Sequence, residues 1–353
     1  MIDLLRELVE IESPTYSAGV RAVAERMARE LERLGASVEV IDGDHVRAQL
    51  PGEREPLLLL GHTDTVWPEG TLERMPFRIE DGLAYGPGAY DMKGCLVLML
   101  EAIRQAQHRR ALRIFLTADE EMGSPTARPH LEQSAQGVAA AFVVEPPSGD
   151  GHLKTARKGL GRFHLAVTGR SAHAGTDRAA GASAIEELAH QVLALHALND
   201  ESSGLSVNVG VVRGGTTENV VAAEAEAHID VRVATAADLA RAERLLQGLE
   251  PVVDGTSLAL SGGWTRPPLE RSPGTARLFA KAREHGRALG LDLRETTSGG
   301  GSDGNLVGAL GIPVLDGLGA LGAGAHGPNE HILIGSLRTR AALLARLLQD
   351  PGI

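Results

Sequence analysis

The sequence predicts an α/β protein with a mixed, largely parallel sheet and a second, inserted α+β domain. Short, continuous apolar segments such as 57–60 and 112–116 are typical of strands that are buried on both faces of a parallel sheet. Helix-forming segments alternate with them, as in α/β layer proteins. Near residue 154 the pattern changes, and the segment 225–233 alternates strictly between apolar and polar residues, which indicates a sheet with one covered face. We therefore expect one domain from 1–153 and 268–353, and an inserted domain from 154–267.

Local periodicity predicts the elements of the first domain. Helical spacing from the first residue favours an amphipathic helix over 1–12, so we do not expect a cleaved leader. A second helix over 17–34 ends at Gly35, where a C-terminal cap is expected. The other elements expected before the insertion are strands at 37–41, 46–50, 57–60, 112–116 and 139–144 and a helix over 93–107. After the insertion we expect a helix over 275–289, a strand at 312–315 and a final helix from Ser336.

The inserted segment has the pattern of a ferredoxin-like unit. Its expected order is strand, helix, strand, strand, helix, strand, at 162–167, 179–196, 205–212, 225–233, 236–249 and 257–260. In the fourth of these elements, one face carries only small or apolar residues, and the other carries Glu226, His228, Asp230 and Arg232. We expect the apolar face to be the covered face of the sheet.

The composition limits the possible functions. The chain has 353 residues, of which 43% are hydrophobic and 23% charged, as in ordinary globular proteins. A formal net charge of −11, without a basic stripe, argues against nucleic-acid binding. No apolar segment reaches the roughly 18 residues of a membrane span. The single cysteine, Cys95, excludes an internal disulfide and is compatible with the cytoplasm, where we expect the protein.

Imidazole and carboxylate side chains follow three of the predicted strands. His62 comes directly after the first of them, Glu120 and Glu121 follow the second, and Glu145 follows the third. The carboxyl ends of parallel strands meet at one edge of a sheet, where the sites of such proteins gather. Zinc and similar ions bind imidazole nitrogen and carboxylate oxygen, so this combination predicts a metal-dependent hydrolytic site. Each residue alone is more often structural, and the combination carries the prediction.

Two metal ions in one site usually share a carboxylate between them. Asp91, in a Gly-rich loop, is the expected bridge. We expect His62 and His326 to bind one ion each, and Glu121 and Glu145 to complete the two sets of ligands. Zinc suits these ligands best, and cobalt or manganese are alternatives.

Two further acids are expected to support this chemistry. Asp64 follows His62 by two residues and is placed to bond the second ring nitrogen of that histidine, which fixes its tautomer. Glu120 then remains as the general base that takes a proton from the attacking water.

These motifs resemble those of the dinuclear-zinc peptidase and deacylase family. That family includes glutamate carboxypeptidase, acetylornithine deacetylase and succinyl-diaminopimelate desuccinylase. The matching segments span nearly the whole chain and are His62-Thr63-Asp64, Asp91-Met92-Lys93-Gly94, Asp119-Glu120-Glu121, Glu145-Pro146 and His326. A further segment, Leu315 to Gly319, is most similar to the glutamate carboxypeptidase branch.

The resemblance implies a zinc-peptidase-type catalytic domain with two zinc ions per subunit. His62 and Glu145 would hold one ion, and Glu121 and His326 the other. Asp91 would bridge the two ions, and a cis peptide bond would follow it.

The resemblance also implies that the inserted domain is a lid through which two subunits form a homodimer. Ser171 to Gly175 is similar to the lid-domain histidine motif of the family, and His173 would polarise the scissile carbonyl across the dimer interface. The segment Gly214 to Val221 resembles the one whose asparagine, Asn219 here, binds substrate.

Two arginines and a glycine-rich loop are further candidates for substrate binding. Arg232 and Arg266 carry planar guanidinium groups that suit a substrate carboxylate, and an ion pair with Asp230 is the alternative for Arg232. The loop at 299–305 lacks the Gly-Lys-Ser/Thr ending of a nucleotide-binding loop. We therefore expect Gly300 to allow close backbone approach to the carboxylate end of the substrate.

The expected function is metal-dependent hydrolysis of an amide bond next to a free carboxylate. The leading version is a zinc carboxypeptidase that releases a C-terminal amino acid such as glutamate. The second is an N-acyl-amino-acid deacylase similar to acetylornithine deacetylase. A catalytically silent binding protein is the third, although it would be expected to have lost Glu120 or a metal ligand. The expected partner is a small peptide or an N-acyl amino acid, and neither nucleic acid nor a membrane.

Overall fold

The computed structural model describes residues 1–106, 110–149 and 151–353, which divide into two compact units. Unit 1 comprises Met1–Ala156, Glu270–Ser298 and Ser302–Ile353, and unit 2 comprises Arg157–Leu269 and Gly299–Gly301. The expected insertion at 154–267 and its lid and dimerisation roles stay predictions, and the inclusion of Gly299–Gly301 in unit 2 was not expected. No helix of the described residues is both long enough and apolar enough to cross a membrane.

Unit 1 is built on a six-stranded sheet with the order β1-β2-β6-β3-β7-β14. Strand β2 is antiparallel to both β1 and β6, whereas β6, β3, β7 and β14 run parallel to one another. This arrangement confirms the predicted α/β class and its mixed, largely parallel sheet. The bounds are β1 Ser37–Ile41, β2 His45–Leu50, β3 Glu53–His62, β6 Arg110–Thr117, β7 Ala140–Val143 and β14 Val314–Leu315.

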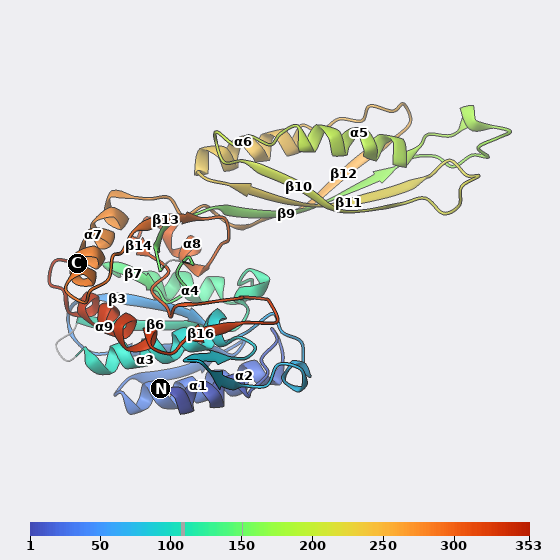
Figure 1. The fold of residues 1–353 in the computed structure, drawn as a ribbon. Coiled ribbons are helices and arrows are strands. Elements are labelled where there is room, and N and C mark those ends of the chain that lie inside the picture. Colours follow the sequence, from blue (N-terminus) through green and yellow to red (C-terminus); the bar gives the residue numbers. More distant parts are fainter. Residues whose placement is uncertain (107–109, 150) are drawn as a thin grey trace. The chain divides into compact units, whose positions relative to one another are not determined.

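Helices cover both faces of this sheet (Figure 1). Leu57 and Leu59 belong to the main core together with apolar residues of α1, α2, α3, α7 and α9. On the opposite face, Gly304 of α8 lies so close to Val143 of β7 that a Cβ atom there would approach its side chain to 3.0 Å. The bounds are α1 Ile2–Val9, α2 Ala18–Arg33, α3 Gly94–Gln105, α4 Arg128–Ala135, α7 Pro273–Arg287, α8 Asp303–Gly308 and α9 Ser336–Gln349.

Several short elements of unit 1 were not predicted. They are β4 Arg78–Glu80, β5 Leu83–Tyr85, β8 Leu153–Arg157, β13 Glu295–Ser298, β15 Gly322–Ala323, β16 His331–Leu333, α4 and α8, and the tight turns η1 Thr71–Glu73, η2 Ala89–Lys93 and η3 Glu120–Met122. Most span too few residues to show a periodicity. The predicted helix over 93–107 ends earlier, at Gln105, and Gln107 lies outside the described residues.

Unit 2 has the predicted ferredoxin-like order. Its four strands lie in the order β10-β11-β9-β12, all antiparallel to their neighbours. Both helices lie on one face of the sheet (Figure 1). The helix predicted from residue 179 begins at Ala184, where the Ser183 side chain caps it; residues 178–180 form the short turn η4. The bounds are β9 Gly159–Thr168, α5 Ala184–His196, β10 Ser206–Gly214, β11 Glu224–Val233, α6 Ala236–Gln247 and β12 Ser257–Arg266.

Candidate metal centre

Three neighbouring parallel strands of unit 1 end beside one another and carry the predicted acids and histidine. His62 is the last residue of β3, the turn Glu120–Met122 follows β6, and Glu145 follows β7. The apolar residues Leu57 to Leu60 of β3 are at most 1% exposed, so this strand is buried on both faces. The sheet therefore holds the starting points of these three segments in a fixed arrangement.

The two ring nitrogens of His62 face different groups. Its Nε2 atom lies 3.2 Å from Asp91 Oδ1 and 3.4 Å from Glu145 Oε1. Its Nδ1 atom lies 3.0 Å from the Asp64 carbonyl oxygen and 3.4 Å from Asp64 Oδ1. Burial alone lowers the pKa of His62, but Asp64, Asp91 and Glu145 outweigh burial and raise this pKa well above its ordinary value. Nε2 thus faces two carboxylates, and Nδ1 is held by the carbonyl and carboxylate oxygens of Asp64.

His326 approaches the same aspartate from the other side. Its Nε2 atom lies 3.4 Å from Asp91 Oδ2 and 3.4 Å from Glu121 Oε1. The histidine has φ of 60° and lies in a turn that the hydrogen bond from Gly327 N to the Gly324 carbonyl closes at 2.8 Å. Asp91 and Glu121 raise the pKa of His326 to about 10 against the effect of burial.

This donor set fits a pair of cations. Asp91 directs one oxygen toward each histidine, which is the arrangement of a carboxylate shared by two ions. Burial raises the pKa of Glu121, and among the described residues its buried Oε1 atom makes no hydrogen bond beyond the 3.4 Å ion-pair contact with His326 Nε2. Donor atoms of His62, Asp91 and Glu121 all lie within 4.8 Å of one another. The structure thus brings all five predicted ligand residues together.

Asp64 connects this cluster to the predicted base. Its Oδ1 atom accepts a hydrogen bond from Glu120 N at 3.2 Å, and its Oδ2 atom accepts one from Glu121 N at 3.2 Å. The Thr15 hydroxyl also donates to Oδ2, at 2.7 Å. Asp64 is 1% exposed. One buried carboxylate therefore orients His62 and fixes the backbone of Glu120 and Glu121.

Sequence reasoning missed a second buried carboxylate, Glu330. It is fully buried and accepts hydrogen bonds from Gly88 N, Tyr90 N and Asp91 N, all at 2.9 Å, and from Trp67 Nε1 at 2.6 Å. These bonds hold the loop that presents Asp91, whose peptide bond to Met92 is cis, as the resemblance implies. The available signal was the position of Glu330, four residues after His326 in the same loop.

In unit 2, the segments of His173 and Asn219 lie side by side. Ala174 N donates a hydrogen bond to the Asn219 carbonyl at 2.9 Å. The Nδ1 atom of His173 accepts hydrogen bonds from Gly175 N at 3.1 Å and Thr176 N at 3.2 Å. Because Nδ1 is an acceptor, the ring proton of neutral His173 is on Nε2. The side chains of His173 and Asn219 are exposed.

Two predicted substrate-binding arginines of unit 2 gather at the loop Gly299–Gly301. Arg232 Nη1 donates to the Gly299 carbonyl at 2.7 Å, and Arg232 Nε forms the alternative ion pair with Asp230 at 2.8 Å. Arg266 is 4% exposed, and its Cδ atom would lie 2.6 Å from a Cβ atom added at Gly301. The Gly300 carbonyl accepts from Arg157 Nη1 at 3.2 Å, a contact that was not predicted. The substrate-binding roles of Arg232, Arg266 and Gly300 stay predictions.

Known proteins share both the sequence and the fold of this chain. The model of peptidase family M20/M25/M40 matches residues 58–350. Carboxypeptidase G2 of a Pseudomonas species is 30% identical, over 100% of this chain and 89% of that protein. Succinyl-diaminopimelate desuccinylase of Halorhodospira halophila is also 30% identical, over 99% of this chain and 97% of that protein.

Two solved structures have a fold similar to that of this chain. The aminopeptidase PepT from Bacillus cereus has a TM-score of 0.84 at 22% identity, covering 99% of this chain and 97% of its own. An M20 family metallo-carboxypeptidase from Sulfolobus solfataricus has a TM-score of 0.77 at 18% identity, covering 99% and 98%. The family model covers most of the chain, and both relatives match it along almost its whole length. This chain is therefore a member of peptidase family M20/M25/M40, and an enzyme of its metallopeptidase and amidohydrolase class.

Proposed function

We propose that this enzyme uses two zinc ions to hydrolyse an amide bond next to a free carboxylate. His62 and Glu145 would hold one ion, His326 and Glu121 would hold the other, and Asp91 would be shared between them. The main support for this proposal is the position of the Asp91 carboxylate between the two histidines. Its Oδ1 atom lies 3.2 Å from His62 Nε2, and its Oδ2 atom lies 3.4 Å from His326 Nε2. Zinc suits imidazole and carboxylate ligands, and cobalt or manganese are the alternatives that metal analysis distinguishes.

The chain's own residues then have separate tasks. When bound, the two cations would polarise the scissile carbonyl and lower the pKa of the attacking water. Glu120 accepts the proton of that water on its carboxylate and passes it to the leaving amine. Asp64 keeps His62 in the tautomer with its Nε2 lone pair available, and keeps Glu120 in position. His173 polarises the substrate carbonyl by donating a hydrogen bond from its Nε2 N–H group to the carbonyl oxygen.

The proposed substrate is a small peptide from which a C-terminal amino acid, such as glutamate, is released. The match to carboxypeptidase G2 over 100% of the chain supports a carboxypeptidase. Arg266, Arg232, Asn219 and the backbone around Gly300 are the proposed partners of the substrate. A guanidinium group binds a carboxylate through two parallel hydrogen bonds, so a free carboxylate is the group that these arginines select.

Deacylation of an N-acyl amino acid is the second candidate. The match to a succinyl-diaminopimelate desuccinylase over 99% of the chain supports it, and the same metal chemistry serves both reactions. A panel of folate-type glutamates, dipeptides and N-acetyl and N-succinyl amino acids separates the two. The proposal predicts the highest kcat/KM for a C-terminal glutamate, and a preference for N-acyl amino acids without peptide cleavage would assign the enzyme to the deacylases.

We also propose that the enzyme is a homodimer joined through unit 2. Strand β10 is at the edge of its sheet and exposes Val211 (42%) and Val212 (56%), while α5 exposes Ile185 (48%) and Leu193 (72%). Exposed apolar residues beside a strand edge support pairing with a second copy. Sedimentation analysis should give a dimer, which Val212→Lys combined with Leu193→Glu converts to a monomer. A wild-type monomer at working concentration would refute the dimer and the role of His173 across it.

We propose the cytoplasm as the site of action. Cys95 is buried, and burial raises the pKa of its thiol, so this sulfhydryl is suited to remain reduced and unreactive. Fractionation of producing cells should find the enzyme with cytoplasmic markers, and recovery from the medium or periplasm would contradict this.

A further inference from the structure

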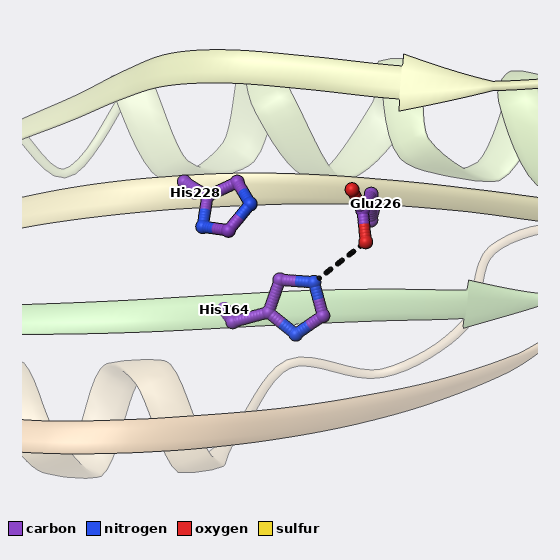
Figure 2. Close-up of side chains that lie close together, drawn as sticks. All are labelled: His164, Glu226 and His228. Atoms are coloured by element: carbon purple, nitrogen blue, oxygen red, sulfur yellow. Dashed lines mark hydrogen bonds and ion pairs between the residues drawn. The ribbon is translucent and has the colours of Figure 1, made fainter.

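A second group of possible metal ligands lies on the strands of unit 2, and the proposed reaction does not use it. His164 belongs to β9, and Glu226 and His228 belong to the neighbouring strand β11 (Figure 2). His164 and His228 are directly opposite each other in the antiparallel register. All three side chains lie on the same side of the sheet (Figure 2), on the polar face that alternates with the buried residues of β11.

The three side chains direct nitrogen and oxygen atoms toward one another. His164 Nε2 lies 3.0 Å from Glu226 Oε2, and the two imidazole ring centroids are 4.9 Å apart. One donor atom from each residue can be chosen so that all three lie within 4.8 Å of one another. Ligand atoms at about 2.0–2.1 Å from a tetrahedral zinc ion are themselves about 3.3 Å apart. His164 and Glu226 are therefore already at about the spacing of two zinc ligands, and a donor atom of His228 lies within 4.8 Å of donor atoms of both.

We propose that His164, Glu226 and His228 bind a divalent cation of the zinc class, with one coordination position open to solvent. Imidazole with carboxylate selects zinc, nickel or copper over magnesium and calcium, which prefer oxygen ligands alone. Strands β9 and β11 are the two central strands of their sheet, so the backbone positions of the ligands are fixed before the ion arrives. His164 and Glu226 are about one-third exposed, which leaves room for water in the fourth position.

The charges around the cluster support a weak site that is open to exchange. Arg213 Nη1 lies 3.2 Å from Glu226 Oε1, the oxygen that does not face His164. Arg213 thus competes with a cation for the same carboxylate and repels it. Its removal should strengthen metal binding, whereas removal of a ligand should weaken it.

Zinc titration of the full-length His62→Ala/His326→Ala variant tests this proposal independently of the metal centre of unit 1. After treatment with a chelator, competition with a chromophoric zinc indicator should detect one zinc ion per chain. Adding His228→Ala should weaken zinc binding by more than roughly 10-fold, because losing a ligand costs more than losing a residue that only supports one. Adding Arg213→Ala should tighten it. His190→Ala, an exposed histidine of α5, is the matched control and should leave binding unchanged.

Folding is monitored by circular dichroism, and His228→Gln provides a second substitution of similar size. The proposal is overturned if the starting variant binds no zinc at micromolar indicator concentrations, or if folded His228→Ala and His228→Gln bind zinc as well as the His190→Ala control. Equal weakening by Arg213→Ala and His228→Ala would also overturn it, because that pattern marks an ion-pair network alone.

Discussion

The two histidine–carboxylate clusters have the same kind of donor atoms but are built differently. The cluster of unit 1 combines the end of strand β3 with loops, and within it His62 is 2% exposed while the His326 side chain is 50% exposed. The cluster of unit 2 comes from two adjacent strands, with side chains about one-third exposed at His164 and Glu226. In unit 1 the surrounding carboxylates raise the pKa of His326 to about 10. Several carboxylates around two histidines therefore create a strong demand for positive charge, and we expect tight metal binding there and weaker binding in unit 2, which has one carboxylate.

The clusters also differ in what holds them. Strand pairing alone fixes the ligands of unit 2, whereas the loops of unit 1 need buried acids that accept backbone N–H groups. Asp64 accepts from Glu120 and Glu121, and Glu330 accepts from the loop at Asp91. A metal centre whose ligands lie in loops therefore depends on neighbouring residues that orient the ligands without binding the metal.

The largest effect should come from Glu120, because it is the proposed base and not a ligand. Glu120→Gln should lower kcat by about 10²–10⁴-fold while the protein still binds two metal ions. Steady-state kinetics together with metal analysis measures both quantities. Intact turnover would show that another group moves the proton, and loss of metal would show that Glu120 is a ligand.

A smaller effect is expected from substitution of Glu330. This substitution tests whether the metal centre of unit 1 depends on the buried carboxylate that holds the Asp91 loop. Both carboxylate oxygens of Glu330 accept hydrogen bonds from N–H groups. In Glu330→Gln the side-chain NH₂ group, itself a donor, would therefore face one of these N–H donors. We expect metal affinity to fall by roughly 10–100-fold, with activity partly restored by excess zinc.

Glu69→Gln is the control for Glu330→Gln, because Glu69 is an exposed glutamate in the same region of unit 1. Unchanged metal affinity in folded Glu330→Gln would mean that the Asp91 loop keeps its shape without this carboxylate.

The smallest effect on activity is expected from Glu187, the corresponding buried carboxylate of unit 2. It accepts hydrogen bonds from Val252 N, Val253 N, Thr256 Oγ1 and Gln191 Nε2. Glu187→Gln should reduce the free energy of unfolding by about 1–3 kcal/mol without changing metal affinity in unit 1. Denaturant unfolding measures this loss, and Glu186→Gln, an exposed neighbour, is the control.

The stabilisation by Glu187 should depend on pH. Burial raises the pKa of Glu187, but hydrogen bonds from Val253, Gln191, Val252 and Thr256 outweigh it and lower this pKa below its ordinary 4.5. A lowered pKa gives stability that is present above the unfolded value and is lost as the pH falls through the folded value. The stability difference between the wild type and Glu187→Gln should therefore shrink below pH 4.5. A difference that stays constant into acid would show that its charge contributes nothing.

The sequence predicted those parts that depend on local patterns. Continuous apolar segments such as Leu57–Leu60 indicated the strands, and the strands indicated where His62 and Glu145 would gather. The ferredoxin-like order of unit 2 followed from the succession of its predicted strands and helices, and the alternation in β11 indicated a sheet with one covered face. The resemblance supplied the pairing of ligands, which spacing alone does not give.

Long-range contacts could not be predicted in this way. Glu330 reaches a loop about 240 residues away, as its hydrogen bond to Asp91 N has a separation of 239 residues. Strands such as β15 and β16 form only by pairing, because two or three residues carry no periodicity. The pairing of His164 with His228 required the register of two strands, which local pattern does not fix.

The most direct test of the central claim is anomalous diffraction from a crystal of zinc-reconstituted enzyme, with data collected on both sides of the zinc absorption edge. We expect two peaks in unit 1, one beside His62 and one beside His326, with the carboxylate of Asp91 between them. A single peak, or zinc away from Asp91, would contradict the shared-carboxylate centre.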